Sequence, residues 1–458
     1  MFYFFLVLWY SIICGGVSMF EYIQLKNFKS FDNLYFNLLD KKGMPKKLVL
    51  IYGENGIGKS NIASAFLMLS DTLCTMDVRD ILEKFLLQDD SPLNHEDFNR
   101  LIKSQYKDIE TIIHECKMVD SVDPMSLEFG FRIGEKSGKY ILETDNVQII
   151  HERLEFTLLK NRGLFFDITP SEMLINPKIF KEKDALSEIR FACKKFWGKH
   201  SLLSILMHES DDKAEQYIKN QISDNFKLVI NFFSHLSCKI KFGSADERSI
   251  ISSSNTLLSR LEKGKISVKK EKQLDTTAKM LTYFFKLTYR DIEKAYYKKE
   301  KRNNIIRYQL MISKYIAGQS RDIDFSLEST GTQSLIQQLP FMLVVLKNAV
   351  SVIDEFDTGI HDLLVKDLLV SLQSYINGQL ILTTHNTLLM ESDIPKESIY
   401  VINELSDGSR EIQCITHYDH KIHANTNIRD QYMLGKYHGI PESAHIDFDH
   451  LLQILEKK

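Results

Sequence analysis

Ten residues near the N-terminus, IYGENGIGKS at positions 51–60, have the types and spacing of a phosphate-binding loop. Gly53 to Ser60 fit the pattern G-x-x-x-x-G-K-[ST], between an apolar run at 48–52 and a helix-like run at 61–69. Glycines let backbone N–H groups converge on phosphate oxygens, and the following helix N-terminus favours negative charge. Lys59 then offers a positive charge to the β- and γ-phosphates of ATP, and Ser60 offers a hydroxyl ligand to Mg²⁺. The predicted loop comprises Gly53, Glu54, Asn55, Gly56, Ile57, Gly58, Lys59, Ser60 and Asn61.

Two further groups of polar residues follow apolar runs near the C-terminal end of the chain. Asp354 and Glu355 end a run at 350–353, where Asp354 would hold Mg²⁺ and Glu355 would orient and deprotonate the attacking water. His385 ends the next run, at 379–384, where it would sense the γ-phosphate. Coupled to the phosphate-binding loop, these residues predict hydrolysis of a nucleoside triphosphate.

A second anion site is predicted at 329–333, before a helix at 335–339. Its candidate ligands are Ser329, Gly331 and Thr332, although the same residues also suit an ordinary helix N-cap. The two anion sites are far apart in the chain. This fits an arrangement in which one ATP is bound by the phosphate-binding loop of one protomer and by the second anion site of another. The segment Asp357–His361 follows the carboxylates, where a turn could reach the neighbouring subunit.

These residues need a framework of parallel strands and helices. Apolar runs separated by helical patterns predict an α/β fold with a doubly wound parallel sheet, and alternating runs at 127–133, 140–142 and 154–159 predict an antiparallel β meander. We expect four parts: a hydrophobic leader at 1–18, the N-terminal part of the head at 19–168, a large helical insertion at 169–323, and the C-terminal part of the head with a tail at 324–458.

The leader, MFYFFLVLWYSIICGGVS, lacks the basic residues of a signal segment and is short for a membrane span. We interpret Met19 as the natural start, with an N-terminal membrane anchor as the alternative. Six scattered cysteines, Cys14 among them, without a C-x-x-C pair favour reduced thiols. We therefore expect a cytoplasmic protein without stable membrane association.

The formal net charge of −3 argues against a protein coated in positive charge for nucleic acid. Two basic segments nevertheless occur, at Lys263–Lys272 and at Lys298–Arg302, the second on an expected helix. Each is either a solvated helix face or a contact with nucleic acid or a partner.

Four motifs in this order, GENGIGKSN, STGTQ, VIDEFDTGIH and LTTHN, resemble those of ABC-type ATPases of the SMC and RecF kind. Within that group the chain is similar to AAA family ATPases of bacterial anti-phage defence and abortive-infection systems, related to the overcoming-lysogenization-defect ATPases. An ending at 428–441, IRDQYMLGKYHGIP, is similar to theirs as well. The resemblance implies an ABC-ATPase head that forms a head-to-tail dimer or a higher homo-oligomer around ATP and Mg²⁺.

Carried over by position, the resemblance makes Gly53–Asn61 the Walker A loop, Asp354 the metal ligand, Glu355 the catalytic base and His385 the switch histidine. It makes Ser329–Gln333 the signature that completes a neighbour's site. The signature departs from the LSGGQ form of transporters, which disfavours a transporter subunit. The usual glutamine after the Walker A helix has no clear counterpart, because nothing around Gln148 is diagnostic.

The function implied is an ATP-hydrolysing sensor or scaffold of an anti-phage system that controls a separate effector, a nuclease, in response to a phage trigger protein or DNA. About 70 residues follow His385, too few for a fused Toprim nuclease. We interpret His417, Asp419, His420 and His423 as a polar surface segment rather than a metal site. The alternative function is a DNA repair or chromosome-maintenance ATPase that clamps DNA.

Overall fold

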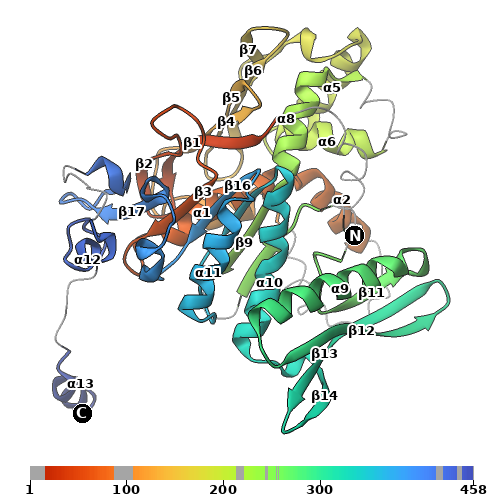
Figure 1. The fold of residues 1–458 in the computed structure, drawn as a ribbon. Helices are drawn as coiled ribbons and strands as arrows, with labels where there is room; N and C mark the ends of the chain where they lie inside the picture. The colour runs from red at the N-terminus through yellow and green to blue at the C-terminus, as the bar shows by residue number, and fades with distance from the viewer. Residues whose placement is uncertain are drawn as a thin grey trace.

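A computed structural model describes residues 16–86, 107–212, 221–242, 246–253, 255, 257–418, 426–440 and 446–456. Two seven-stranded sheets form the upper body in Figure 1, and a four-stranded sheet lies below them. Residues 1–15 of the leader, with Cys14, and the residues Asp419, His420, His423 and Pro441 lie outside the described residues. In the described part of the chain, no helix combines the length and apolar character needed to cross a bilayer.

The central sheet has the strand order β10-β9-β15-β16-β3-β17-β18, and its five inner strands are parallel. The strands span Leu236–Phe242 (β9), Asp246–Ile250 (β10), Leu48–Tyr52 (β3), Val350–Ile353 (β15), Gln379–Thr383 (β16), Ile399–Glu404 (β17) and Arg410–Cys414 (β18). All five side chains of β3 are buried, with Val49 and Ile51 in one core and Leu48, Leu50 and Tyr52 in the other. The strands of the central sheet read as continuous apolar runs, rather than alternating apolar and polar residues, because both faces of the sheet are covered by other elements.

The second sheet is antiparallel throughout, in the order β2-β1-β4-β5-β6-β7-β8. Its strands span Ser18–Phe28 (β1), Phe31–Asn37 (β2), Met125–Ile133 (β4), Lys136–Thr144 (β5), Ile149–Thr157 (β6), Arg162–Ile168 (β7) and Met173–Ile175 (β8). The predicted meander is confirmed as β4, β5 and β6.

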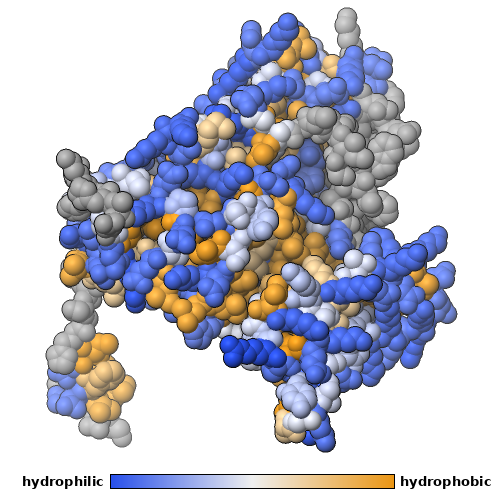
Figure 2. Space-filling model, viewed as in Figure 1, coloured by the Kyte–Doolittle hydropathy of each residue, from blue (hydrophilic) through white to orange (hydrophobic). Residues whose placement is uncertain are grey.

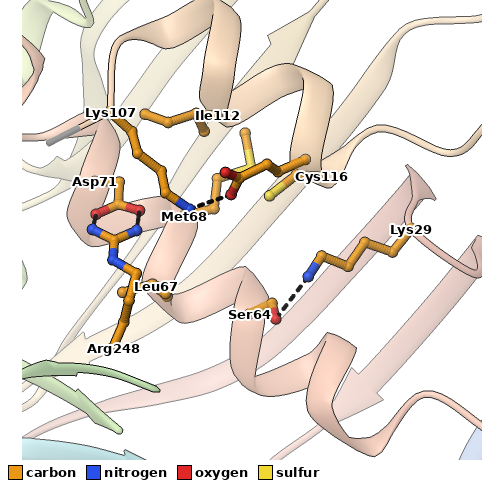
Figure 3. Close-up of a pocket in the computed structure, with 10 residues that line it drawn as sticks. Lys29, Ser64, Leu67, Met68, Asp71, Lys107, Ile112, Cys116 and Arg248 are labelled. Carbon is orange, nitrogen blue, oxygen red and sulfur yellow. Dashed lines mark hydrogen bonds and ion pairs between the residues drawn. The ribbon is translucent and has the colours of Figure 1, made fainter. Parts of the chain in front are cut away.

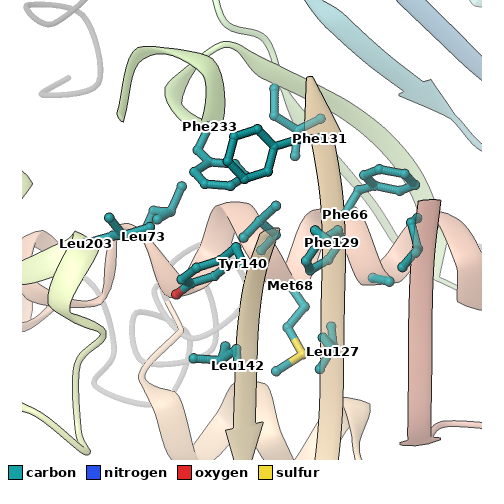
Figure 4. Close-up of a cluster of buried hydrophobic side chains, with 14 of the residues drawn as sticks. Phe66, Met68, Leu73, Leu127, Phe129, Phe131, Tyr140, Leu142, Leu203 and Phe233 are labelled. Carbon is teal, nitrogen blue, oxygen red and sulfur yellow. The ribbon is translucent and has the colours of Figure 1, made fainter. Parts of the chain in front are cut away.

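Helix α1 (Lys59–Thr72) lies between the two sheets and is buried along nearly all of its length. Figure 4 shows Phe66 and Met68 of α1 against Leu127 and Phe129 of β4. The ring centroids of Phe66 and Phe129 are 6.1 Å apart, within the range of favourable aromatic contact. The helix that begins at the phosphate-binding loop is thus fixed from both sides.

The other helices cover the outer faces. Around the N-terminal half lie α2 (Thr75–Leu86), α4 (Ile109–Cys116), α5 (Lys183–Phe196), α6 (Leu202–Asp212) and α8 (Asp224–Ser234). On the opposite face of the central sheet lie α10 (Thr330–Val344) and α11 (Asp362–Gln373), and near the C-terminus α12 (Ile428–Met433) and α13 (Phe448–Glu456). The predicted fold class, an α/β head with a parallel sheet and a meander, is confirmed.

The expectation of a large helical insertion at 169–323 is wrong beyond about residue 235. Helices α5, α6 and α8 fill much of its first part, but β9 and β10 join the central sheet, and the remainder combines helix α9 (Glu271–Thr288) with a third sheet. The third sheet pairs β13 (Ile305–Ile316) with β11 (Lys263–Ser267), β12 (Ile292–Arg302) and β14 (Gln319–Asp324), under helix α9. The basic segment Lys298–Arg302 is therefore on a strand, not on the expected helix. It pairs with 305–309 across a two-residue turn, and this local hairpin takes the place of the expected helix.

Candidate functional site

The phosphate-binding loop connects β3 to α1, as its motif requires. Gly53, Gly56 and Gly58 have φ angles of 148°, 80° and 116°, a region that side-chain-bearing residues rarely adopt. At Gly58 a Cβ atom would also lie 2.7 Å from the Cζ atom of Phe31. The loop conformation therefore depends on glycine for both backbone and space.

Lys59, the first residue of α1, is buried and directed back over the loop. Its ammonium donates hydrogen bonds to the carbonyl oxygens of Gly53 at 2.9 Å and Glu54 at 2.8 Å. Burial lowers the pKa of Lys59, and the nearby Asp354 and Glu355 carboxylates oppose this effect. The ammonium thus sits between the loop and the acidic strand end.

Asp354 lies directly after β15 and is 2% exposed. The Thr383 hydroxyl donates to its Oδ1 atom at 2.6 Å, and the Ser60 hydroxyl of α1 lies near the same carboxyl. Burial raises the pKa of the Asp354 carboxyl, and the Thr383 and Ser60 hydroxyls oppose that rise. The fold therefore joins Ser60 and Asp354, which are 294 positions apart in the sequence.

The oxygen atoms at this point suit a hard divalent cation. Asp354 Oδ2 is buried and has no hydrogen-bond partner among the described residues, and the Ser60 hydroxyl lies beside it. Mg²⁺ prefers a few oxygen ligands of this type and keeps several waters. The donor set therefore fits Mg²⁺, with Ser60 and Asp354 as the residues that would hold it.

Glu355 is only partly buried and has a left-handed backbone, with φ of 49°. Its N–H donates to Thr383 Oγ1 at 2.7 Å, which fixes this uncommon conformation. Its Oε2 atom accepts hydrogen bonds from Lys241 Nζ and Thr358 Oγ1, each at 3.1 Å. Partial burial acts to raise the pKa of Glu355, but the two hydrogen bonds and the Lys241 charge outweigh it, so the pKa is lowered. The carboxylate is thus held ionised.

His385 follows β16 and is exposed at the edge of the same site. Its backbone N–H donates to Asp357 Oδ2 at 3.0 Å. Partial desolvation of its ring and then the positive charge of Lys59 lower the pKa of His385. The imidazole is therefore neutral near pH 7, and it can either donate or accept a hydrogen bond.

The predicted second anion site caps α10. Ser329 Oγ accepts a hydrogen bond from the Thr332 N–H at 3.2 Å and lies 2.8 Å from Thr332 Oγ1, so these polar atoms are engaged with one another. A Cβ on Gly331 would lie 2.4 Å from the Gly359 carbonyl oxygen, so the turn at Asp357–His361 packs directly on the start of α10. The structure thus joins the second anion site to the turn after the carboxylates, within one chain.

The far end of α1 is tied to the central sheet by ion pairs (Figure 3). Arg248 of β10 contacts both carboxylate oxygens of Asp71, at 2.6 and 2.8 Å. Lys29, from the turn between β1 and β2, donates to Ser64 of α1 at 3.0 Å. The hairpin β9–β10 therefore contacts the phosphate-loop helix from one face and Glu355 from the other, through residues that lie close together near its turn.

A family model described as "AAA domain, putative AbiEii toxin, Type IV TA system" matches residues 48–391, from β3 to beyond His385. The chain belongs to this family. The match covers both the phosphate-binding loop and the acidic strand end, and it supports an ATPase domain of the AAA type. No curated protein matches the chain.

Solved structures similar to this AAA-family chain include three SMC heads. The SMC head domain from Thermotoga maritima is 16% identical with a TM-score of 0.36, covering 87% of this chain and 99% of that one. An SmcHead bound to the C-winged helix domain of ScpA is 14% identical with a TM-score of 0.42, covering 86% and 97%. A Smc head domain with a coiled coil and joint, derived from Pyrococcus yayanosii, is 13% identical with a TM-score of 0.41, covering 92% and 99%.

The sequence motifs of this AAA-family chain do not include two residues of the site. Thr383 lies at a strand end and contacts both Asp354 and Glu355. Lys241 falls in the region expected to be helical, whereas the alternating run CKIKF at 238–242 is a strand signal. Gln148 lies in the turn before β6, where its N–H donates to Asp145 Oδ1. In the described part of the chain, no group of three or more His, Cys, Asp and Glu residues is arranged to hold a metal ion.

Proposed function

We propose that this chain is an ATP-hydrolysing switch whose complete site forms between two copies of the chain. The observation that carries the proposal is the convergence of Ser60, Lys59, Asp354 and Glu355 at the carboxyl ends of neighbouring parallel strands. Ligands bind at that edge of open α/β sheets.

In the proposed reaction, Gly53–Asn61 and Lys59 bind the β- and γ-phosphates of ATP. Ser60 and Asp354 would hold Mg²⁺, which would neutralise charge on the phosphates. Glu355, kept ionised by Lys241, orients a water and accepts its proton, and His385 hydrogen-bonds the γ-phosphate or that water. Ser329, Gly331 and Thr332 of a second copy close the site, which makes head pairing dependent on ATP.

Glu355→Gln tests the chemical part of this proposal. The variant keeps the shape of the side chain but cannot accept the proton, so we expect ATP binding to persist while turnover falls about 100-fold or more. Slow turnover should also accumulate ATP-bound dimers, which size-exclusion chromatography with light scattering would detect. Turnover close to that of the wild-type protein would place the base elsewhere.

We further propose that the switch serves an anti-phage defence system and controls a separate effector, a nuclease. The family description, which names a putative toxin of a Type IV TA system, supports a role of this kind. Phage challenge of cells that carry the chain with its neighbouring genes tests it. Lys59→Ala should abolish protection, and unchanged protection would contradict the proposal.

The same cells distinguish the alternative, a DNA-clamping repair ATPase. That alternative predicts sensitivity to DNA damage when the chain is deleted and no change in phage resistance. The defence proposal predicts the reverse.

A further inference from the structure

Positive charge is concentrated in one short part of this acidic chain. Residues 263–324 contain 16 lysines and arginines but only seven aspartates and glutamates, a net charge of +9, whereas the whole chain carries −3. These residues form α9 and the sheet of β11 to β14. At the lower right of Figure 2, where this sheet reaches outward, the surface is almost uniformly hydrophilic. A basic face on an acidic protein is the electrostatic mark of a polyanion-binding surface.

A groove of about 940 Å³ lies between α9 and β12 on this basic face. Its lining includes four lysines, an exposed and a half-buried tyrosine, and two carboxylates: Lys279, Lys286, Lys294, Lys299, Tyr283, Tyr296, Asp275 and Glu293. The packing of α9 along β12 sets the groove's direction. It is open to solvent along the exposed side of α9.

The lysines in the groove differ in how their charges are balanced. Lys299 contacts Asp275 at 2.6 Å and Glu271 at 3.4 Å, so its charge is compensated. Within the described residues, no carboxylate lies within 4.0 Å of the ammonium groups of Lys279, Lys286 or Lys294. The carboxylate of Glu293 accepts instead from the Ser320 hydroxyl at 2.7 Å. Three lysines without an ion pair to a described residue therefore line the groove.

Aromatic rings lie among these charges. Tyr283 is 70% exposed, and it follows Lys279 by four residues and precedes Lys286 by three, so the three side chains share one face of α9. On β12, Lys294 Nζ lies 5.6 Å from the centre of the Tyr296 ring. A large exposed ring between lysines has no role in the core of the sheet, but it can stack on a base.

We propose that the groove between α9 and β12 binds single-stranded nucleic acid. Phosphates contact Lys279, Lys286 and Lys294, and a base stacks on Tyr283. Single strands fit better than a duplex because unpaired bases expose the flat faces that an exposed tyrosine can stack on. The proposal goes beyond ATP hydrolysis and does not depend on it, so Lys59→Ala should bind nucleic acid as the wild-type protein does.

Fluorescence anisotropy of the full chain with a labelled oligo-dT strand tests this site. Combining Lys279→Ala, Lys286→Ala and Lys294→Ala should weaken binding at least tenfold. It should also reduce the slope of log affinity against log salt by about 2, since each phosphate contact on a single strand contributes about 0.7. The matched control combines Lys160→Ala, Lys178→Ala and Lys347→Ala, three exposed lysines outside the groove, and should bind like the wild-type protein.

Tyrosine variants test the stacking contact separately. Tyr283→Ala should weaken binding about fivefold or more without changing the salt slope, and Tyr283→Phe should restore it. The proposal is overturned if the control lysine variant loses as much affinity as the groove variant. It is also overturned if poly-glutamate competes as well as oligo-dT, which would assign the groove to an acidic protein. If the matching duplex bound more tightly than the single strand and Tyr283→Ala did not weaken that binding, single-stranded nucleic acid would be excluded as the ligand.

Discussion

Lys241 Nζ lies 3.1 Å from Glu355 Oε2, so a lysine on β9 holds the carboxylate that is placed to activate water. The contact joins residues 114 positions apart. It also gives the hairpin β9–β10 a direct influence on the site, because Arg248 on the same hairpin contacts Asp71 of α1.

Removal of this lysine should change the pH dependence of hydrolysis. In Lys241→Met the partial burial of Glu355 is no longer opposed by the ammonium, so the pKa of Glu355 should rise. A base must be ionised to act, so the acid limb of the kcat profile should move to higher pH, with the largest loss of activity at the acidic end. Steady-state ATPase assays across pH 5 to 9 measure this. Lys241→Arg should restore the wild-type profile, and a uniform loss at every pH would contradict the assignment.

Mixed dimers test whether Ser329 completes the site of another copy. Lys59→Ala and Ser329→Arg should each be inactive alone, because every site in each homodimer has one damaged half. A mixture should recover activity, up to roughly a quarter of the wild-type level, since half the dimers are mixed and each has one intact site. ATPase activity at several mixing ratios is the measurement. If Ser329 acted within its own chain, no ratio would give recovery.

The ion pair between Arg248 and Asp71 should matter for stability. Its side chains are 15% and 11% exposed, and burial acts to raise the pKa of Asp71 while Arg248 opposes this. Arg248→Met should reduce the free energy of unfolding by about 3 kcal/mol, because it leaves a buried carboxylate without its partner. Urea denaturation gives this value. Asp71→Leu combined with Arg248→Met removes both charges and should recover most of the loss, and a double variant as unstable as the single one would argue against the pair.

Glu152 should make stability depend on pH in the opposite sense to most carboxylates. Burial raises the pKa of Glu152 to about 7, against hydrogen bonds from the N–H of Leu202, the Trp197 indole and the Tyr140 hydroxyl. The folded state therefore binds a proton that the unfolded state releases near its ordinary pKa of 4.5. Glu152 therefore contributes about 3 kcal/mol to the free energy of unfolding. This contribution is fully present below pH 4.5 and is lost as the pH rises through 7.

Glu152→Gln, which stays neutral, should remove this contribution. Urea denaturation at pH 5 and pH 8 should show a smaller fall in the free energy of unfolding for the variant than for the wild-type protein. An equal fall in both proteins would exclude Glu152 as the cause.

The sequence by itself determined the parts of this protein whose geometry is local. Gly53 to Ser60 form their loop because glycine torsions, an apolar strand before and a helix after are all set by neighbours in the chain. The strand that ends in Asp354 and Glu355 was predicted from its own apolar residues.

Only the tertiary structure decided what depends on distant partners. Residues Lys263–Ser267 form β11 because 305–309 of β13 pairs with them. Lys241 meets Glu355 because β9 lies beside β15 in the parallel sheet. The groove exists because α9 packs along β12. Strand pairing and packing join residues far apart in the chain, and a local pattern carries no information about which partner a segment will meet.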